Sequence, residues 1–166
     1  KVGDKIAVLP TLKESAIRSV YVAGAKKEAA KAGDSVTIEL EDDVDVSRGN
    51  MLVPAAGVFI QTNAFSATIN WMDEQLLNIG KTYLLQHGVN IVKAKITSLQ
   101  SVLNIHTMDE DAEKKTLGLN DIGKATLKTA KPIFADLYKE NRRNGAFILI
   151  DEFTNNTVAV GFVESY

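Results

Sequence analysis

The stretch Phe65-Ser66-Ala67-Thr68-Ile69-Asn70-Trp71 decides the fold class of this chain. Apolar side chains occupy every second position, with small polar residues between them. Successive side chains of a β-strand point to opposite faces, so this alternation predicts a strand with one buried face. Trp71 is the sole tryptophan, and we expect it to anchor a core or a contact between two barrels.

The same pattern recurs along the chain in residues 16–22, 36–40, 83–85, 89–105, 125–127 and 158–162. Turn signals such as Gly3-Asp4 and Asn144-Gly145 separate these segments, and the chain holds 11 glycines but only 3 prolines. Phe147–Ile150 is continuously apolar, as expected for a strand covered on both faces. Short strands joined by hairpins predict an all-β protein.

Two segments depart from the strand pattern. Residues 25–32 (AKKEAAKA) have high helix propensity but would make only about two helical turns, so we expect an edge strand and a turn. Residues 134–143 are compatible with one or two helical turns before Asn144-Gly145.

A boundary between two domains is expected at Val53-Pro54-Ala55-Ala56-Gly57, where small residues and a proline precede a new strand pattern. This divides the chain into 1–56 and 57–166. The connection is short, so we expect the two parts to pack together. The chain opens at Lys1 rather than at methionine and enters its alternation at once, from which we expect a fragment lacking an upstream portion.

Composition excludes several classes of function. The formal net charge of −2 argues against a generally basic nucleic-acid binder, and the lack of cysteine excludes disulfides and thiolate metal sites. The chain has neither an apolar run of membrane-spanning length nor a secretory pattern at its start. We therefore expect a cytoplasmic protein with no membrane or nucleic-acid partner.

Most chemical motifs in the chain are incomplete. Gly80-Lys81-Thr82 resembles the end of a phosphate-binding loop, but Gln75 stands where that motif needs its first glycine, so a hairpin entry is expected. The only histidines, His87 and His106, fall in separate predicted strands and form no helical metal pair. We expect no catalytic, cofactor-binding or metal-binding residue in this chain.

Other polar clusters are expected to be turns. The acidic runs Glu41-Asp42-Asp43-Asp45 and Asp109-Glu110-Asp111 lack the spacing and glycine of a calcium loop, so solvated hairpin turns are the stronger interpretation. Asn155-Asn156-Thr157 matches a glycosylation acceptor but, without a secretory signal, is expected to be a turn between strands.

Asn141-Arg142-Arg143-Asn144, with nearby Lys139, forms the one concentrated basic patch. Two interpretations remain open. The planar guanidinium groups of Arg142 and Arg143 are suited to contact a phosphate or an acidic partner. Alternatively, the arginines hold neighbouring backbone carbonyl groups of a turn. Asn141, Arg142 and Arg143 are therefore the candidate partner-contact residues.

Several motifs carry a family resemblance. The runs Val2–Pro10, Ala32–Val36 and Ser47–Leu52 resemble the middle β-barrel of translational GTPases such as elongation factor Tu. The second half is more specific and is similar to the large subunit of sulfate adenylyltransferase, through the segments Phe65–Glu74, Gly80–Leu85, Leu119–Gly123, Tyr138–Asp151 and Thr154–Gly161. The chain departs at Leu12, where the family often has a small turn residue.

The resemblance implies two packed antiparallel β-barrels of the translational-GTPase type, the first incomplete because strands precede Val2 in the family. It implies a parent protein with an upstream GTPase domain that holds GTP and Mg²⁺. With a small catalytic subunit, the parent makes adenosine 5′-phosphosulfate from ATP and sulfate in sulfate assimilation. In some bacteria an adenylylsulfate kinase domain follows. The GTPase motifs are missing from these residues, so the expected role is non-catalytic.

Two other functions stay open. One is a barrel fragment of a translation elongation factor that binds aminoacyl-tRNA, against which the near-neutral charge argues. The other is a free-standing β-barrel interaction module without an enzymatic parent. The incomplete first barrel would leave an unpaired strand edge, which we expect a neighbouring chain, the second barrel or disorder to cover.

Overall fold

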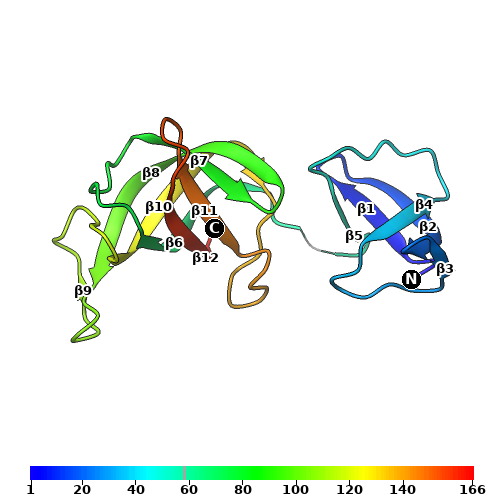
Figure 1. The fold of residues 1–166 in the computed structure, drawn as a ribbon, viewed down its shortest axis with the longest axis horizontal. Helices are drawn as coiled ribbons and strands as arrows, with labels where there is room; N and C mark the ends of the chain where they lie inside the picture. The colour runs from blue at the N-terminus through cyan, green and yellow to red at the C-terminus, as the bar shows by residue number, and fades with distance from the viewer. Residues whose placement is uncertain (58) are drawn as a thin grey trace. The chain divides into compact units, whose positions relative to one another are not determined.

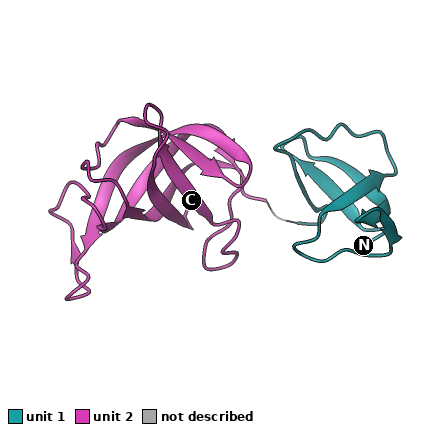
Figure 2. Cartoon of the chain, in the orientation of Figure 1, with its two compact units in different colours: residues 1–58 teal, residues 59–166 magenta. Residues whose placement is uncertain are grey.

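The computed structural model describes residues 1–57 and 59–166. The chain divides into two compact units, Lys1–Val58 and Phe59–Tyr166, shown in teal and magenta in Figure 2. Every regular element among the described residues is a β-strand, and every strand pairing is antiparallel. The prediction of an all-β protein is confirmed.

The first unit is an open five-stranded sheet. Its strands are β1 (Lys5–Leu9), β2 (Lys13–Val22), β3 (Ala25–Lys27), β4 (Val36–Leu40) and β5 (Met51–Pro54). They are arranged in the order β3-β2-β1-β5, with β4 also pairing with β2. Among the described residues β4 pairs only with β2 and β5 only with β1, so the sheet does not close. The first barrel is therefore incomplete, as predicted.

The core of the first unit is small. It consists of four buried side chains, to which Val22, Leu52 and a few other half-buried residues are added. β1 is buried at four of its five positions because β2 and β5 flank it. Leu12, in the β1–β2 turn, has φ of +59°, a left-handed conformation that favours glycine.

Two details of the first unit bear on the sequence predictions. Ala25–Lys27 forms the edge strand β3 as expected, although its composition favours a helix. Val53 and Pro54 belong to β5 rather than to a linker, so the expected boundary begins too early. Pro54 ends this edge strand. Proline has no backbone N–H group, and at this position the sheet does not require one to hydrogen-bond to a neighbouring strand.

The second unit is a closed six-stranded barrel with a short added strand. Its strands are β6 (Thr62–Trp71), β7 (Thr82–His87), β8 (Asn90–Leu103), β9 (Glu110–Asp111), β10 (Ile122–Ile133), β11 (Ala146–Asp151) and β12 (Thr157–Ser165). The order β10-β6-β12-β11-β7-β8 closes through a β10–β8 pairing, and β9 extends from β8. Figure 1 shows these strands curling around one interior.

The barrel interior is filled by the alternating side chains. In β6, Phe65, Ala67, Ile69 and Trp71 are buried, and the alternate residues Ser66, Thr68 and Asn70 are only half-buried. The rings of Phe65 and Phe147 meet edge to face with centroids 5.6 Å apart, and those of Trp71 and Tyr83 at 5.9 Å. Such pairs stabilise the core beyond the burial of their apolar area. This core is also much more extensive than that of the first unit.

Residues 134–143, compatible with one or two helical turns, form no regular helix but contain isolated turns at residues 138–140 and 142–144, closed by bonds from Asn141 N to Leu137 O and from Gly145 N to Asn141 O. Two other predictions about the second unit were wrong. His106 lies in a turn beyond the end of β8 rather than in a strand. Phe147–Ile150 is not covered on both faces: Phe147 and Leu149 are buried, whereas Ile148 and Ile150 remain half-buried, because a closed barrel has only one interior face.

Candidate functional site

The candidate partner-contact loop is the β10–β11 connection, residues 134–145. It carries Arg142 and Arg143 at its exposed tip. Neither guanidinium group makes a hydrogen bond or ion pair with any other residue that the structure describes. This geometry favours the interpretation in which the arginines are available to a partner over the one in which they hold turn carbonyls.

Asn141 has a different position in the loop. Its side-chain amide nitrogen donates to Asp136 Oδ2 at 2.8 Å, and its backbone carbonyl oxygen accepts from Gly145 N at 2.8 Å. Asn144 Nδ2 donates to the same Asp136 oxygen at 3.0 Å and to Phe134 O at 2.9 Å. The hydrogen bonds of Asn141 therefore stabilise the conformation of the loop, whereas the side chains of Arg142 and Arg143 face outward from it.

The barrel wall fixes the loop from below. His87, buried at the end of β7, donates from Nε2 to Asn144 O at 2.7 Å. Gly145 has no room for a side chain, since an added Cβ would lie 2.4 Å from the Cα of Tyr138. Tyr138 in turn packs on Phe162 with ring centroids 4.4 Å apart. The arginines thus sit on a preorganised loop rather than on a loose one.

The sequence did not reveal that Asp136 and His87 hold this loop through hydrogen bonds. The Asn144-Gly145 turn signal was visible, and it marked the place correctly. What the sequence did not reveal is that β7 runs beneath this turn, which follows from the β11–β7 pairing.

Gly80-Lys81-Thr82 enters strand β7, as expected from the failed phosphate-loop match. Gly80 has φ of +88°, and Thr82 begins the strand. Lys81 Nζ lies 2.5 Å from Asp151 Oδ2, so its charge is already compensated. Hydrogen bonding from Lys81, aided by the amides of Thr154 and Phe153, lowers the pKa of Asp151 to about 2.

The acidic clusters have separate structural roles. Asp42 accepts a hydrogen bond from Ser15 Oγ at 2.8 Å and so ties the end of β4 to β2. Glu110 was expected in a solvated turn, but Glu110–Asp111 forms β9 against Val102 and Leu103. A hydrogen bond from Lys124, supported by one from Ser101, lowers the pKa of Glu110. Across the described residues, neither run gathers three carboxylates in an arrangement suited to a metal ion.

The remaining predicted turn is confirmed. Asn155 lies between β11 and β12 with φ of +59°, a conformation that asparagine tolerates well.

None of the described segments forms a helix capable of spanning a lipid bilayer.

Comparison with known proteins places this architecture in a family. A family model described as GTP-eEF1A C-terminal domain-like matches residues 64–164. The chain is 38% identical over 161 residues to sulfate adenylyltransferase subunit 1 of Bacteroides fragilis, covering 97% of this chain and 34% of that protein. It is 37% identical to the bifunctional enzyme NodQ of Rhizobium sp., covering 97% of this chain and 25% of that protein. It therefore spans about a third of the length of its subunit 1 relatives.

The solved structure of Sup35 complexed with GMPPNP matches with a TM-score of 0.86 at 21% identity, over 99% of this chain and 41% of that one. At this identity the match concerns the fold, and it agrees with the predicted translational-GTPase type of barrel. With a barrel of this topology and a family model that covers most of its second unit, the chain belongs to the GTP-eEF1A C-terminal domain-like family.

Proposed function

We propose that this chain is a non-catalytic β-barrel part of the large subunit of a GTP-dependent sulfate adenylyltransferase. The observation that carries the proposal is the 38% identity to a sulfate adenylyltransferase subunit 1 over 97% of the chain. In this function the large subunit couples GTP hydrolysis to the synthesis of adenosine 5′-phosphosulfate from ATP and sulfate. The reaction takes place in the cytoplasm and is the first step of sulfate assimilation.

The barrels act as a scaffold between two active centres located elsewhere. A GTPase domain of the same subunit holds GTP and Mg²⁺, and the small subunit adenylylates sulfate. Coupling requires contacts that differ between the nucleotide states of the GTPase domain. The preorganised β10–β11 loop supports such a role, because Arg142 and Arg143 are exposed and free of partners among the described residues.

A binding measurement with the small catalytic subunit tests the proposal. The 166-residue chain is immobilised and the small subunit is passed over it at moderate salt. We expect binding that weakens about tenfold in the Arg142→Ala/Arg143→Ala double variant, since exposed arginines are frequent interface anchors. Lys26→Ala/Lys27→Ala, which removes the same charge from exposed positions of β3, is the matched control and should bind normally.

Absence of binding by the unmodified chain contradicts the scaffold role. The chain alone should neither bind a fluorescent GTP analogue nor release pyrophosphate from ATP and sulfate. Retention of aminoacyl-tRNA with a steep salt dependence would instead favour a translation factor, because phosphate contacts release counterions.

A further inference from the structure

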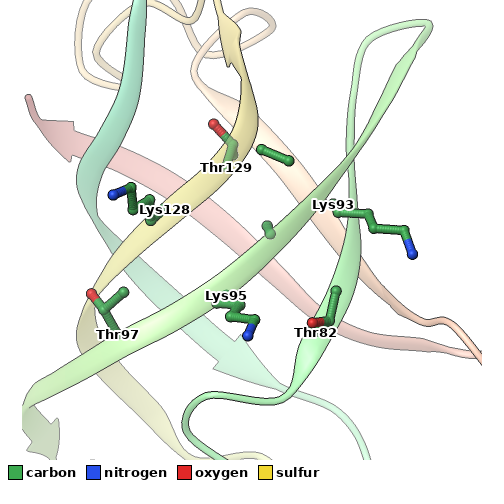
Figure 3. Close-up of a pocket in the computed structure, with 8 residues that line it drawn as sticks. Thr82, Lys93, Lys95, Thr97, Lys128 and Thr129 are labelled. Carbon is green, nitrogen blue, oxygen red and sulfur yellow. The ribbon is translucent and has the colours of Figure 1, made fainter.

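A hollow lined by three lysines, here called the basic hollow, lies on the second barrel at strands β7, β8 and β10. It has a volume of about 350 Å³ and is lined by side chains of β7, β8 and β10, including Lys93, Lys95 and Lys128 together with Thr82, Thr97 and Thr129. Figure 3 shows the lysine side chains projecting from neighbouring strands and pointing in different directions around the hollow. The residues that line it include three lysines and no acidic residue.

The strand register places two of these lysines at directly opposite positions of neighbouring strands. Lys95 of β8 is directly opposite Lys128 of β10, and both side chains are exposed. Neither ammonium group makes an ion pair or hydrogen bond within the described part of the chain. Directly opposed like charges destabilise an antiparallel pair. The arrangement is therefore unfavourable for folding and is suited to a ligand that brings negative charge.

Lys93 shows what kind of group this surface accepts. Its Nζ lies 2.6 Å from Glu152 Oε1, an ion pair between β8 and the β11–β12 loop. A carboxylate of the chain thus already pairs with one of the three lysines, and Lys95 and Lys128 lack such a partner among the described residues.

The residue after Glu152 is the most exposed large apolar side chain of the described chain, Phe153, at 84%. Its loop is held firmly. Asp151 Oδ1 accepts from the amides of Phe153 at 2.8 Å and Thr154 at 3.0 Å, and Lys81 binds the other carboxylate oxygen of Asp151. A phenyl ring presented to solvent on a braced loop is a typical anchor of a protein interface.

We propose that the basic hollow and Phe153 form one docking surface for an extended, acidic segment of a partner polypeptide. Carboxylates of the segment face Lys95 and Lys128, and an apolar side chain of it contacts Phe153. This surface is additional to the proposed contact through Arg142 and Arg143.

The donors of the hollow favour carboxylates over a phosphate group. The hydroxyl groups of Thr97 and Thr129 donate to the carbonyl oxygens of Thr126 and Asn63. The amides of β8 and β10 serve the strand ladder, and the lining contains no arginine. Ammonium groups that lie apart from one another can each bind a different carboxylate of a ligand. Phosphate sites, in contrast, usually bind one phosphate group through several backbone amides or through the planar guanidinium group of arginine.

Fluorescence anisotropy with a labelled hexaglutamate peptide at low salt tests the proposal on the 166-residue chain. We expect binding that weakens about tenfold in Lys128→Glu, because that change replaces attraction by repulsion. The same variant should unfold at a higher temperature than the unmodified chain, since the introduced carboxylate would face Lys95 as an opposite charge. Lys26→Glu, an equal charge change on exposed β3, should leave binding unchanged.

A second peptide with leucine in place of one glutamate tests the role of Phe153. It should bind more tightly than hexaglutamate, and Phe153→Ala should remove that gain without affecting hexaglutamate binding. No binding of either peptide, or equal losses in Lys128→Glu and Lys26→Glu, would overturn the proposal. Tighter binding of tripolyphosphate or of a single-stranded oligonucleotide than of hexaglutamate would also overturn it in favour of a phosphate ligand.

Discussion

Gly161 is a single residue on which the barrel wall depends. It lies directly opposite Phe147 in the β11–β12 pair, and a Cβ added to it would lie 2.2 Å from the phenyl ring. The ring cannot move away easily, because it also packs edge to face against Phe65. Glycine is therefore required here by close packing, not by its backbone conformation.

Gly161→Ala should lower the free energy of unfolding of the second unit by about 2 kcal/mol, the usual cost of overpacking a core. Urea denaturation followed by tryptophan fluorescence measures this change. In the Phe147→Leu background the alanine should cost much less, since leucine frees the space above position 161. Equal costs in the two backgrounds would show that the ring is not the obstacle.

Asp151 contributes a pH-dependent part of the stability. Its pKa is lowered to about 2 by Lys81 and two backbone amides. A carboxyl group whose pKa is lower in the folded state stabilises the fold above its unfolded pKa, and that stabilisation is lost as the pH falls. The relevant window runs from the unfolded value of 3.8 down to about 2.

Asp151→Asn should therefore destabilise the barrel by about 1–2 kcal/mol at pH 7, after allowance for solvent screening of the partly exposed Lys81. The difference from the unmodified chain should shrink as the pH is lowered from about 4 toward about 2. Chemical denaturation at several pH values measures it. Asp43→Asn, at an exposed position, is the control and should show no such trend.

At the scale of elements, β7 and the β10–β11 loop are coupled through one hydrogen bond. His87 ends β7 and donates to Asn144 O, so the strand supports the loop that carries the arginines. Such a contact links barrel packing to the geometry of the candidate partner site.

His87→Leu should cost about 1–2 kcal/mol of stability, because it removes a buried hydrogen bond and leaves the Asn144 carbonyl without its side-chain donor. Hydrogen exchange of the Gly145 amide, which is bonded to Asn141 O, should accelerate in this variant. Gln86→Leu changes the neighbouring, outward-facing position of β7 and should leave this exchange rate unchanged. Unaltered protection of Gly145 in His87→Leu would contradict the coupling.

At the scale of the whole molecule, the two units differ in the size of their cores. Four buried hydrophobic residues form the centre of the first unit, and twenty-one form that of the second. The first unit is also an open sheet, in which β4 and β5 each pair with one strand among the described residues, whereas the second is closed. Stability follows buried apolar area, so the first unit is expected to be the weaker one.

The chain should therefore unfold in two steps, the first unit first. Trp71 reports on the second unit alone, since it is the only tryptophan and lies in that core. With increasing urea, the far-ultraviolet circular dichroism should begin to change before the fluorescence of Trp71 does. Coincident transitions would instead indicate that the units unfold cooperatively.

Local patterns predicted the strands because their period of two depends only on neighbouring residues. Phe65, Ile69 and Trp71 are buried where that alternation predicted. Local patterns determine less where local preference competes with tertiary contacts. Residues 134–143 have helix-compatible composition, but Asp136 and Asn144 bond to each other and His87 holds the Asn144 carbonyl, which leaves separate turns.

The sequence by itself determined that this protein is built of antiparallel strands, which positions of each strand are buried, and which family its motifs resemble. The tertiary structure alone decided that Lys95 faces Lys128, that Asn141 braces a loop while Arg142 stays free among the described residues, and that one barrel closes while the other sheet remains open. Alternation of side chains is a property of adjacent residues. Register and closure depend on pairings between segments far apart in the chain, which a local pattern does not encode.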